Sequence, residues 1–227
     1  FECNEAISAG LTGIMHLRNE AMPSRFSARR QSPRMKVTSV NTGRTGFIGV
    51  GERRVASAIF KAPVAGPVAV QALGLAGDEQ ADLVVHGGLA KAVYAYPAEH
   101  YAFWRTVRAQ AGVSAWNDAL APGSLGENLT LEGLPESAAW IGDVLRFPDC
   151  ALAVSEPRLP CFKFNARMGF AQAAALMQQS GGCGYYLAVL SPGSIAAGET
   201  FRIEPGPREV RIDELFRARV PKARARP

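Results

Sequence analysis

The chain has 227 residues, of which 48% are hydrophobic and 20% charged, so it can form one globular domain with appendages and needs no disulfides to support its core. Its net charge of +5 lies at the ends, because residues 1–36 hold six Lys or Arg against three acids and residues 208–227 hold seven against three. This distribution argues against a folded nucleic-acid-binding face, and no apolar run reaches the roughly 18–20 residues of a membrane span.

The two ends read as appendages to a central domain. Residues 1–34 are rich in Ser, Arg, Asn and Met without sustained periodicity, so we expect a leader that is disordered or not native to the protein. Strand-like sequence begins directly after Met35, and the folded domain is predicted over residues 35–207. Residues 208–227 form a basic tail, whose apolar residues from Val210 onward have loosely helical spacing and predict the remnant of a helical extension.

Short segments rich in β-branched or aromatic residues, bounded by turn formers, predict strands along the whole domain. They cover residues 36–41, 55–60, 68–73, 93–96, 128–131, 144–147, 151–154, 185–190 and 201–204. Two helices are predicted, one from Pro97 to a stop at Gly112 and one over about 170–179 before a glycine pair. Many short strands with few helices predict a mainly β fold, a closed or nearly closed β-barrel with a few peripheral helices.

The stretch 156–163, Glu-Pro-Arg-Leu-Pro-Cys-Phe-Lys, carries the clearest sign of chemistry. Its two prolines predict a stiff, non-helical turn. Arg158 and Lys163 place a cation on each side of Cys161. Cationic neighbours lower the pKa of a thiol and favour the thiolate, which is the form that attacks and that binds metals. From these residues alone, a buried structural thiol explains Cys161 equally well.

Two further segments are candidates for ligand binding. His86 and Gly87 begin a His-Gly-Gly run that follows an apolar stretch, and glycines there would free backbone N–H groups for an anion, although an ordinary turn has the same sequence. Asn128 enters a predicted strand that could present it inward. The four cysteines form no Cys-x-x-Cys pair, so zinc-ribbon and thioredoxin signals are absent, and their isolation fits a reducing, cytoplasmic compartment.

Taken in order, these motifs resemble the MOSC-domain family (molybdenum cofactor sulfurase C-terminal-like) and, within it, the YiiM-type branch. They are Gly-Asp at 77–78, His-Gly-Gly at 86–88, Lys-Ala-Val-Tyr at 91–94, Gly-Glu-Asn-Leu at 126–129 and Pro-Cys-Phe-Lys at 160–163. The resemblance spans about residues 37–204. The combination of the histidine box and the cysteine box is far more specific than either alone.

The resemblance implies a β-barrel protein that binds molybdenum cofactor or handles sulfur for it. Cys161 would be both the metal ligand and the catalytic residue. The other residues implied to bind the cofactor are His86, Gly87, Asn128, Arg158, Lys163 and Arg167.

The resemblance further implies a molybdenum-cofactor-dependent oxidoreductase that reduces small N-hydroxylated bases or related compounds to amines and water. Electrons would come from a separate reductase, because no flavin or nicotinamide motif is visible. Two alternatives stay open: a sulfur carrier that uses a Cys161 persulfide, and a non-catalytic module that binds or delivers the cofactor. The branch usually carries a C-terminal helical domain, expected to be missing or stunted here, which leaves open whether the chain forms a homodimer.

Overall fold

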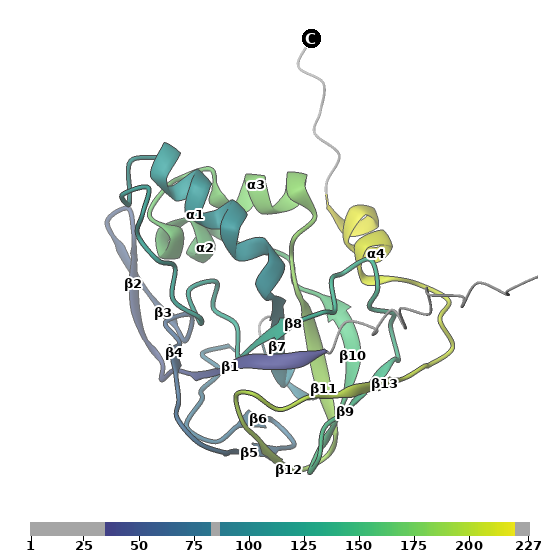
Figure 1. The fold of residues 1–227 in the computed structure, drawn as a ribbon. Coiled ribbons are helices and arrows are strands. Elements are labelled where there is room, and N and C mark those ends of the chain that lie inside the picture. The colour runs from purple at the N-terminus through teal and green to yellow at the C-terminus, as the bar shows by residue number, and fades with distance from the viewer. Residues whose placement is uncertain (1–34, 83–86, 221–227) are drawn as a thin grey trace, which may run out of the picture. The chain divides into compact units, whose positions relative to one another are not determined.

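An eight-stranded sheet in the order β13-β9-β10-β11-β7-β8-β1-β4 forms the centre of the fold (Figure 1). The computed structural model describes residues 35–82 and 87–220, and these lie in the unit Pro33–Pro227. The strands of the sheet are β1 Lys36–Thr42, β4 Ala62–Pro63, β7 Val93–Pro97, β8 Leu129–Glu132, β9 Val144–Arg146, β10 Ala151–Pro157, β11 Tyr185–Ser191 and β13 Arg202–Glu204. Only the β7–β8 pair among them is parallel.

Two smaller sheets complete the β structure. One contains β12 (Gly193–Ile195), β5 (Val68–Gln71) and β6 (Gly74–Leu75). The other is a hairpin of β2 (Gly46–Val50) and β3 (Arg53–Ser57), which turns at Gly51 with a φ of 58°. Two-residue hairpin loops require such a positive φ, and glycine adopts it without strain.

In the described part of the chain, four helices flank the sheets: α1 Tyr101–Gln110, α2 Phe162–Met168, α3 Ala173–Ser180 and α4 Ile212–Arg219, with short 3₁₀ turns at Leu89–Lys91 and Ala98–His100. Figure 1 shows α1, α2 and α3 gathered beyond one end of the central sheet, while α4 lies beside β10. Trp104 of α1 is fully buried and meets Phe164 of α2 edge to face at 5.3 Å. Within the described ranges, no helix is long and apolar enough to cross a membrane.

The prediction of a mainly β chain with few helices is confirmed, but the described strands do not form a closed barrel. β1 meets the segment before β13 only at the isolated bridge between Lys36 and Thr200 and a few backbone hydrogen bonds, such as Val37 N–H to Glu199 O at 2.8 Å. The chain turns at Gly198, with a φ of 91°, before a longer ladder can form.

The prediction of a non-helical turn over 156–163 is only partly right. Pro157 ends β10 and residues 158–161 are irregular, but α2 begins at Phe162. A proline restricts mainly itself and the residue before it, so Pro160 does not prevent a helix that starts two residues later. The hairpin strand β2 and the short β12 were not predicted, whereas helices formed where the spacing around 97–112, 170–179 and 210–219 indicated them.

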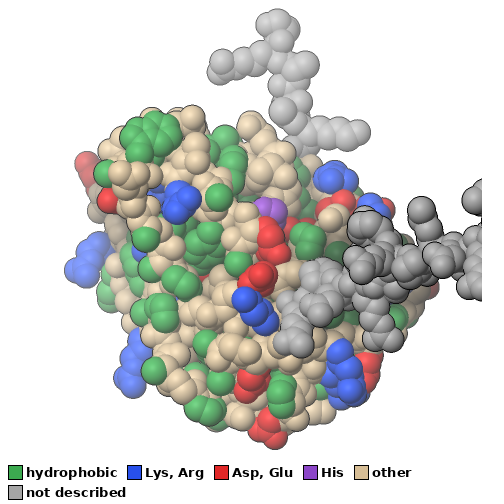
Figure 2. Space-filling model, in the orientation of Figure 1, with side chains coloured by type: hydrophobic (Ala, Val, Ile, Leu, Met, Phe, Trp, Pro, Cys, Tyr) green, Lys and Arg blue, Asp and Glu red, His purple; other side chains and the backbone are tan. Residues whose placement is uncertain are grey.

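On the face shown in Figure 2, the Lys and Arg side chains of the described residues are scattered singly among apolar and acidic ones. A nucleic-acid-binding face would show them clustered. No such cluster is visible among the described residues of this face.

Candidate functional site

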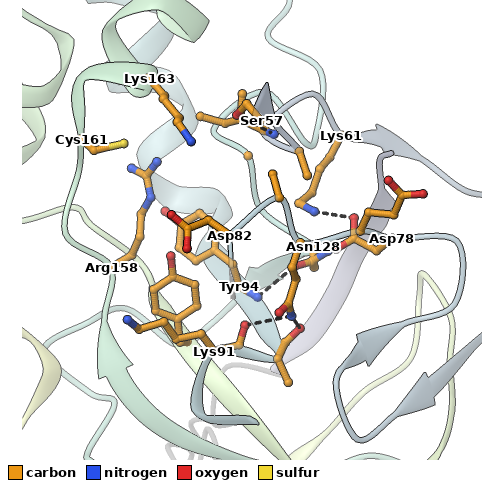
Figure 3. Close-up of a pocket in the computed structure, with 18 residues that line it drawn as sticks. Ser57, Lys61, Asp78, Asp82, Lys91, Tyr94, Asn128, Arg158, Cys161 and Lys163 are labelled. Carbon is orange, nitrogen blue, oxygen red and sulfur yellow. Dashed lines mark hydrogen bonds and ion pairs between the residues drawn. The ribbon is translucent and has the colours of Figure 1, made fainter. Parts of the chain in front are cut away.

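One pocket of about 100 Å³ collects most of the candidate residues (Figure 3). Its walls come from the segment that follows β3, from the loop after β6, from the strands β7 and β11, and from the segment between β10 and α2. The polar side chains that line it include Ser57, Lys61, Asp78, Asp82, Lys91, Asn128, Arg158, Cys161 and Lys163, together with the rings of Tyr94 and Tyr186.

Cys161 occupies the N-cap position of α2 and is partly exposed. Figure 3 shows its sulfur on the same side of the pocket as the Arg158 and Lys163 side chains. The other cysteines of the described chain, Cys150 and Cys183, are buried, and burial raises the pKa of Cys150 to about 11 and that of Cys183 well above its ordinary value. Cys161 is therefore the thiol that a ligand in this pocket can reach.

Arg158 is a cation inside the protein, only 6% exposed. Its guanidinium lies 4.8 Å from the ring centre of Phe164 and 5.3 Å from that of Tyr94, and it donates to the sulfur of Met177 at 3.3 Å. None of the ion pairs formed between described residues includes Arg158. A buried cation outside a close ion pair is costly, so the position of Arg158, which shares the pocket with Asp82, favours an anionic ligand there.

Two lysines extend this positive wall. Lys163 donates from Nζ to the carbonyl of Ala56 at 2.9 Å, which ties α2 to β3. Lys91 lies 5.9 Å from the ring centre of Tyr186 and 3.8 Å from the carboxylate of Glu156. Glu156 also accepts a 2.9 Å hydrogen bond from Arg219 of α4. The carboxylate of Glu156 at this edge of the pocket thus contacts both Lys91 and the last helix.

The opposite wall holds a buried ion pair between Lys61 and Asp78, whose side chains are 8% and 5% exposed. Asp78 also accepts from the backbone N–H of Gly43 and from Asn128 Nδ2, each at 2.8 Å. Asn128 in turn accepts from Tyr94 N–H at 3.0 Å. Burial lowers the pKa of Lys61, and the attraction of Asp78 and, more weakly, of Glu127 opposes that shift.

The acid of the Gly-Glu-Asn-Leu motif, Glu127, has a structural role. Its fully buried carboxylate accepts from the N–H groups of Gly123 and Leu125, at 2.7 and 3.0 Å, and from the hydroxyls of Thr130 and Tyr101. Burial raises the pKa of Glu127. The residue organises the loop before β8, and this loop lies against the segment that carries Lys61.

The structure brings Cys161, Arg158, Lys163 and Asn128 into one pocket, whereas Arg167 and Gly87 do not line it. Arg167 lies 5.2 Å from the ring centre of Phe60 and donates weakly to Gly123 O, and it does not line the pocket. Gly87 does not line it either. A side chain there would collide with the amide oxygen of Gln80, which accepts from Gly88 N–H at 2.9 Å. His86 lies outside the described residues.

The side-chain amide of Asn128 faces the pocket, but it is already hydrogen-bonded within the protein. Its oxygen accepts from Tyr94 and its nitrogen donates to Asp78 and to Asn41 O. It therefore holds Asp78 in place. Sequence reasoning missed Lys61, because a single lysine before Ala-Pro gives no signal. It singled out Asp78 only as part of the Gly-Asp motif at 77–78, because the burial of Asp78 depends on contacts from distant segments.

A profile for the MOSC domain matches residues 82–202, which is more than half of the chain. The chain therefore belongs to the MOSC-domain family. It is 38% identical to protein YiiM of Escherichia coli over 159 residues, which cover 70% of this chain and 68% of that protein. It is 36% identical to the uncharacterized protein YflK of Bacillus subtilis over 170 residues, 75% of this chain and 73% of that one.

A fungal protein called a reductase, from Gibberella moniliformis, is 35% identical over 170 residues, but this chain spans only 29% of its length. Among solved structures, the crystal structure of YiiM from Geobacillus stearothermophilus superposes with a TM-score of 0.63 at 31% identity. The match covers 80% of this chain and 82% of that one. The protein is thus YiiM-like in both sequence and fold.

Proposed function

We propose that the pocket holds the metal end of molybdenum cofactor through Cys161 and that the protein reduces N-hydroxylated bases or related small compounds. One observation carries this proposal: a partly exposed thiol shares a pocket with a buried guanidinium that enters no ion pair among the described residues. A soft sulfur ligand and a stabilising positive charge are what a metal centre on an anionic pterin requires.

The donor set fits the metal end of such a cofactor. Thiolate is a suitable ligand for a soft metal centre, and guanidinium and ammonium groups form strong hydrogen bonds to anionic sulfur and phosphate oxygens. The enclosed volume of about 100 Å³ is smaller than the roughly 300–1,000 Å³ of pockets that surround a drug-sized ligand. The pocket therefore suits the metal and its nearest ligands better than a whole pterin ring system.

When bound, the cofactor supplies a two-electron redox centre that the side chains lack. The protein's own residues would bind the cofactor and orient it. Cys161 holds the metal, while Arg158 and Lys163 balance negative charge beside it. The rings of Tyr94 and Tyr186 also line the pocket.

Reduction is favoured over the two alternatives by the similarity to a fungal protein called a reductase. The N-hydroxylated substrate class comes from the family resemblance of the motifs, as does an electron donor on a separate protein.

The test is the metal and pterin content of protein purified from a host that makes molybdenum cofactor. We expect about one molybdenum per chain, turnover of an N-hydroxylated purine with an artificial electron donor, and loss of both in Cys161→Ser. Cys150→Ser is the matched control and keeps both. A metal-free protein that accumulates cyanide-labile sulfur on Cys161 would instead establish the sulfur carrier. Bound metal without turnover would establish the binding module.

A further inference from the structure

We infer that Lys61 is the acid that protonates the oxygen leaving the substrate, and that Asp78 and Asn128 are positioning residues that hold it ready. This inference rests on the proposed reduction of N-hydroxylated bases. That reaction consumes protons as well as electrons, and the thiol and guanidinium side of the pocket is suited to binding rather than to giving up a proton.

The stoichiometry of the reaction shows that protons have to be supplied to the substrate. Reduction of R–NHOH to R–NH₂ and water breaks the N–O bond and takes up two electrons and two protons. The electrons come from the bound cofactor, which an external donor recharges. One proton passes from Lys61 Nζ to the departing oxygen, and solvent supplies the other and later reprotonates Lys61. A bond to oxygen breaks more easily when the oxygen is protonated as it leaves.

Geometry places Lys61 for this role. Its Nζ faces the pocket across from Cys161, as Figure 3 shows, and its side chain is only 8% exposed. The ammonium carries three N–H donors, and the hydrogen bond to Asp78 is the only one recorded for it among the described residues. A substrate in the pocket can therefore meet a proton that bulk water reaches poorly.

The surroundings also set the acidity of Lys61. Burial lowers its pKa, which brings an amine closer to the working range of a general acid, while Asp78 and Glu127 limit that shift. The remaining charged side chains that line the same pocket are Glu79, Asp82, Lys91, Arg158 and Lys163. Arginine would not serve at position 61, because guanidinium does not release its proton at accessible pH.

Asp78 has no freedom to move toward a ligand. Its two oxygens accept from Gly43 N–H, from Asn128 Nδ2 and from Lys61. This set of contacts fixes the direction of the ammonium group. A general acid that is held in position in this way loses little entropy in the reaction.

The experiment compares Lys61→Ala and Lys61→Arg with the wild type, all loaded with cofactor and supplied with an artificial electron donor. We expect kcat to fall by about 100-fold or more in both variants, in line with loss of a general acid. Molybdenum content and KM should stay within about threefold. Methylammonium should restore at least a tenth of the activity of Lys61→Ala, whereas tetramethylammonium, which carries charge but no proton, should not.

Asp78→Asn gives a second readout. Activity requires protonated Lys61, so the rate falls as pH rises through the pKa of that amine. Removing the carboxylate takes away a group that raises this pKa, and the fall should move to lower pH. Apoprotein labelled with ¹³C on lysine Cε gives a readout that needs no turnover. The pKa of Lys61, assigned from the Lys61→Arg spectrum, should lie below the ordinary lysine value of about 10.4.

The outcomes separate this inference from the proposed function. Full activity in Lys61→Arg, equal rescue by the two cations, or loss of molybdenum in Lys61→Ala would each overturn the inference while the reductase function stands. A pKa of Lys61 at or above the ordinary lysine value of about 10.4 would also overturn it. A metal-loaded wild type without any turnover of N-hydroxylated substrates would overturn both.

Discussion

The guanidinium of Arg158 lies 4.8 Å from the ring centre of Phe164, and Phe164 belongs to the helix that begins directly after Cys161. This contact fixes the distance between the cation of the pocket and the segment that carries the thiol. Both residues are buried, with Arg158 6% exposed and Phe164 fully covered. A buried contact therefore joins the cation to the helix that follows the thiol.

Arg158→Met should separate binding from folding. Removing a buried charge that has no ion-pair partner among the described residues should change the free energy of unfolding of the apoprotein by less than about 2 kcal/mol, or raise it. The molybdenum content should fall at least tenfold. Arg202→Met, at a side chain that is 78% exposed, is the control and should leave the metal content unchanged. Wild-type metal content in Arg158→Met would contradict the role given to Arg158.

His100 should make stability depend on pH. Burial opposes its charge, but the hydrogen bond and attraction of Glu136, at 2.8 Å, outweigh burial and raise the pKa of His100. The stability gained is fully present below the unfolded value of about 6.5 and is lost as pH rises through the higher folded pKa. Urea unfolding of the wild type and His100→Gln should differ by about 1–2 kcal/mol at pH 5.5 and by much less at pH 9. A difference independent of pH would rule out this account.

Glu127→Gln should destabilise the loop before β8. The glutamine NH₂ group has to face a donor that now contacts carboxylate, either the N–H of Leu125 or the group of donors on the other oxygen. Leaving buried donors unpaired costs about 1–3 kcal/mol each. We expect a loss of about 2–4 kcal/mol in urea unfolding. Glu132→Gln, at a half-exposed pair with Lys36, should cost less than about 1 kcal/mol.

Gly123→Ala tests the close approach of that loop to the segment of Lys61. Gly123 has a φ of 83°, and a Cβ there would lie 2.6 Å from the carbonyl oxygen of Lys61. Gly66 has a φ of 76° with nothing within 4 Å, so Gly66→Ala measures the backbone strain alone, about 1–2 kcal/mol. Gly123→Ala should cost about 1–3 kcal/mol more because of the collision. Equal losses in the two variants would show that the contact is not tight.

The sequence was sufficient for those features that depend on local pattern. Alternating apolar residues located most strands, and the predicted helix stops are found at Gly112, with a φ of 72° just after α1, and at Gly181, with a φ of 76° at the end of α3. The cysteine box and its cations also emerged from short-range spacing. These features need no knowledge of what lies across the fold.

Features that depend on distant contacts could not be found in this way. The burial of Lys61 and Asp78 comes from Gly43, Asn128 and the loop at 123, which are far apart in sequence. Gly87 looked like part of an anion site, but its lack of a side chain serves the packing of Gln80. Arg167 lies over the ring of Phe60 rather than in the pocket, one turn of α2 beyond Lys163, and a helix at 162 was itself unexpected.

The carboxylate of Glu156 forms ion pairs with both Arg219 at the end of α4 and Lys91 on the pocket wall. Replacing it with a neutral residue would take the same negative charge away from both places. The pocket would then attract anions more strongly while the last helix lost an anchor. Ligand affinity and the attachment of the C-terminal helix are thus coupled, in opposite senses, through a single side chain.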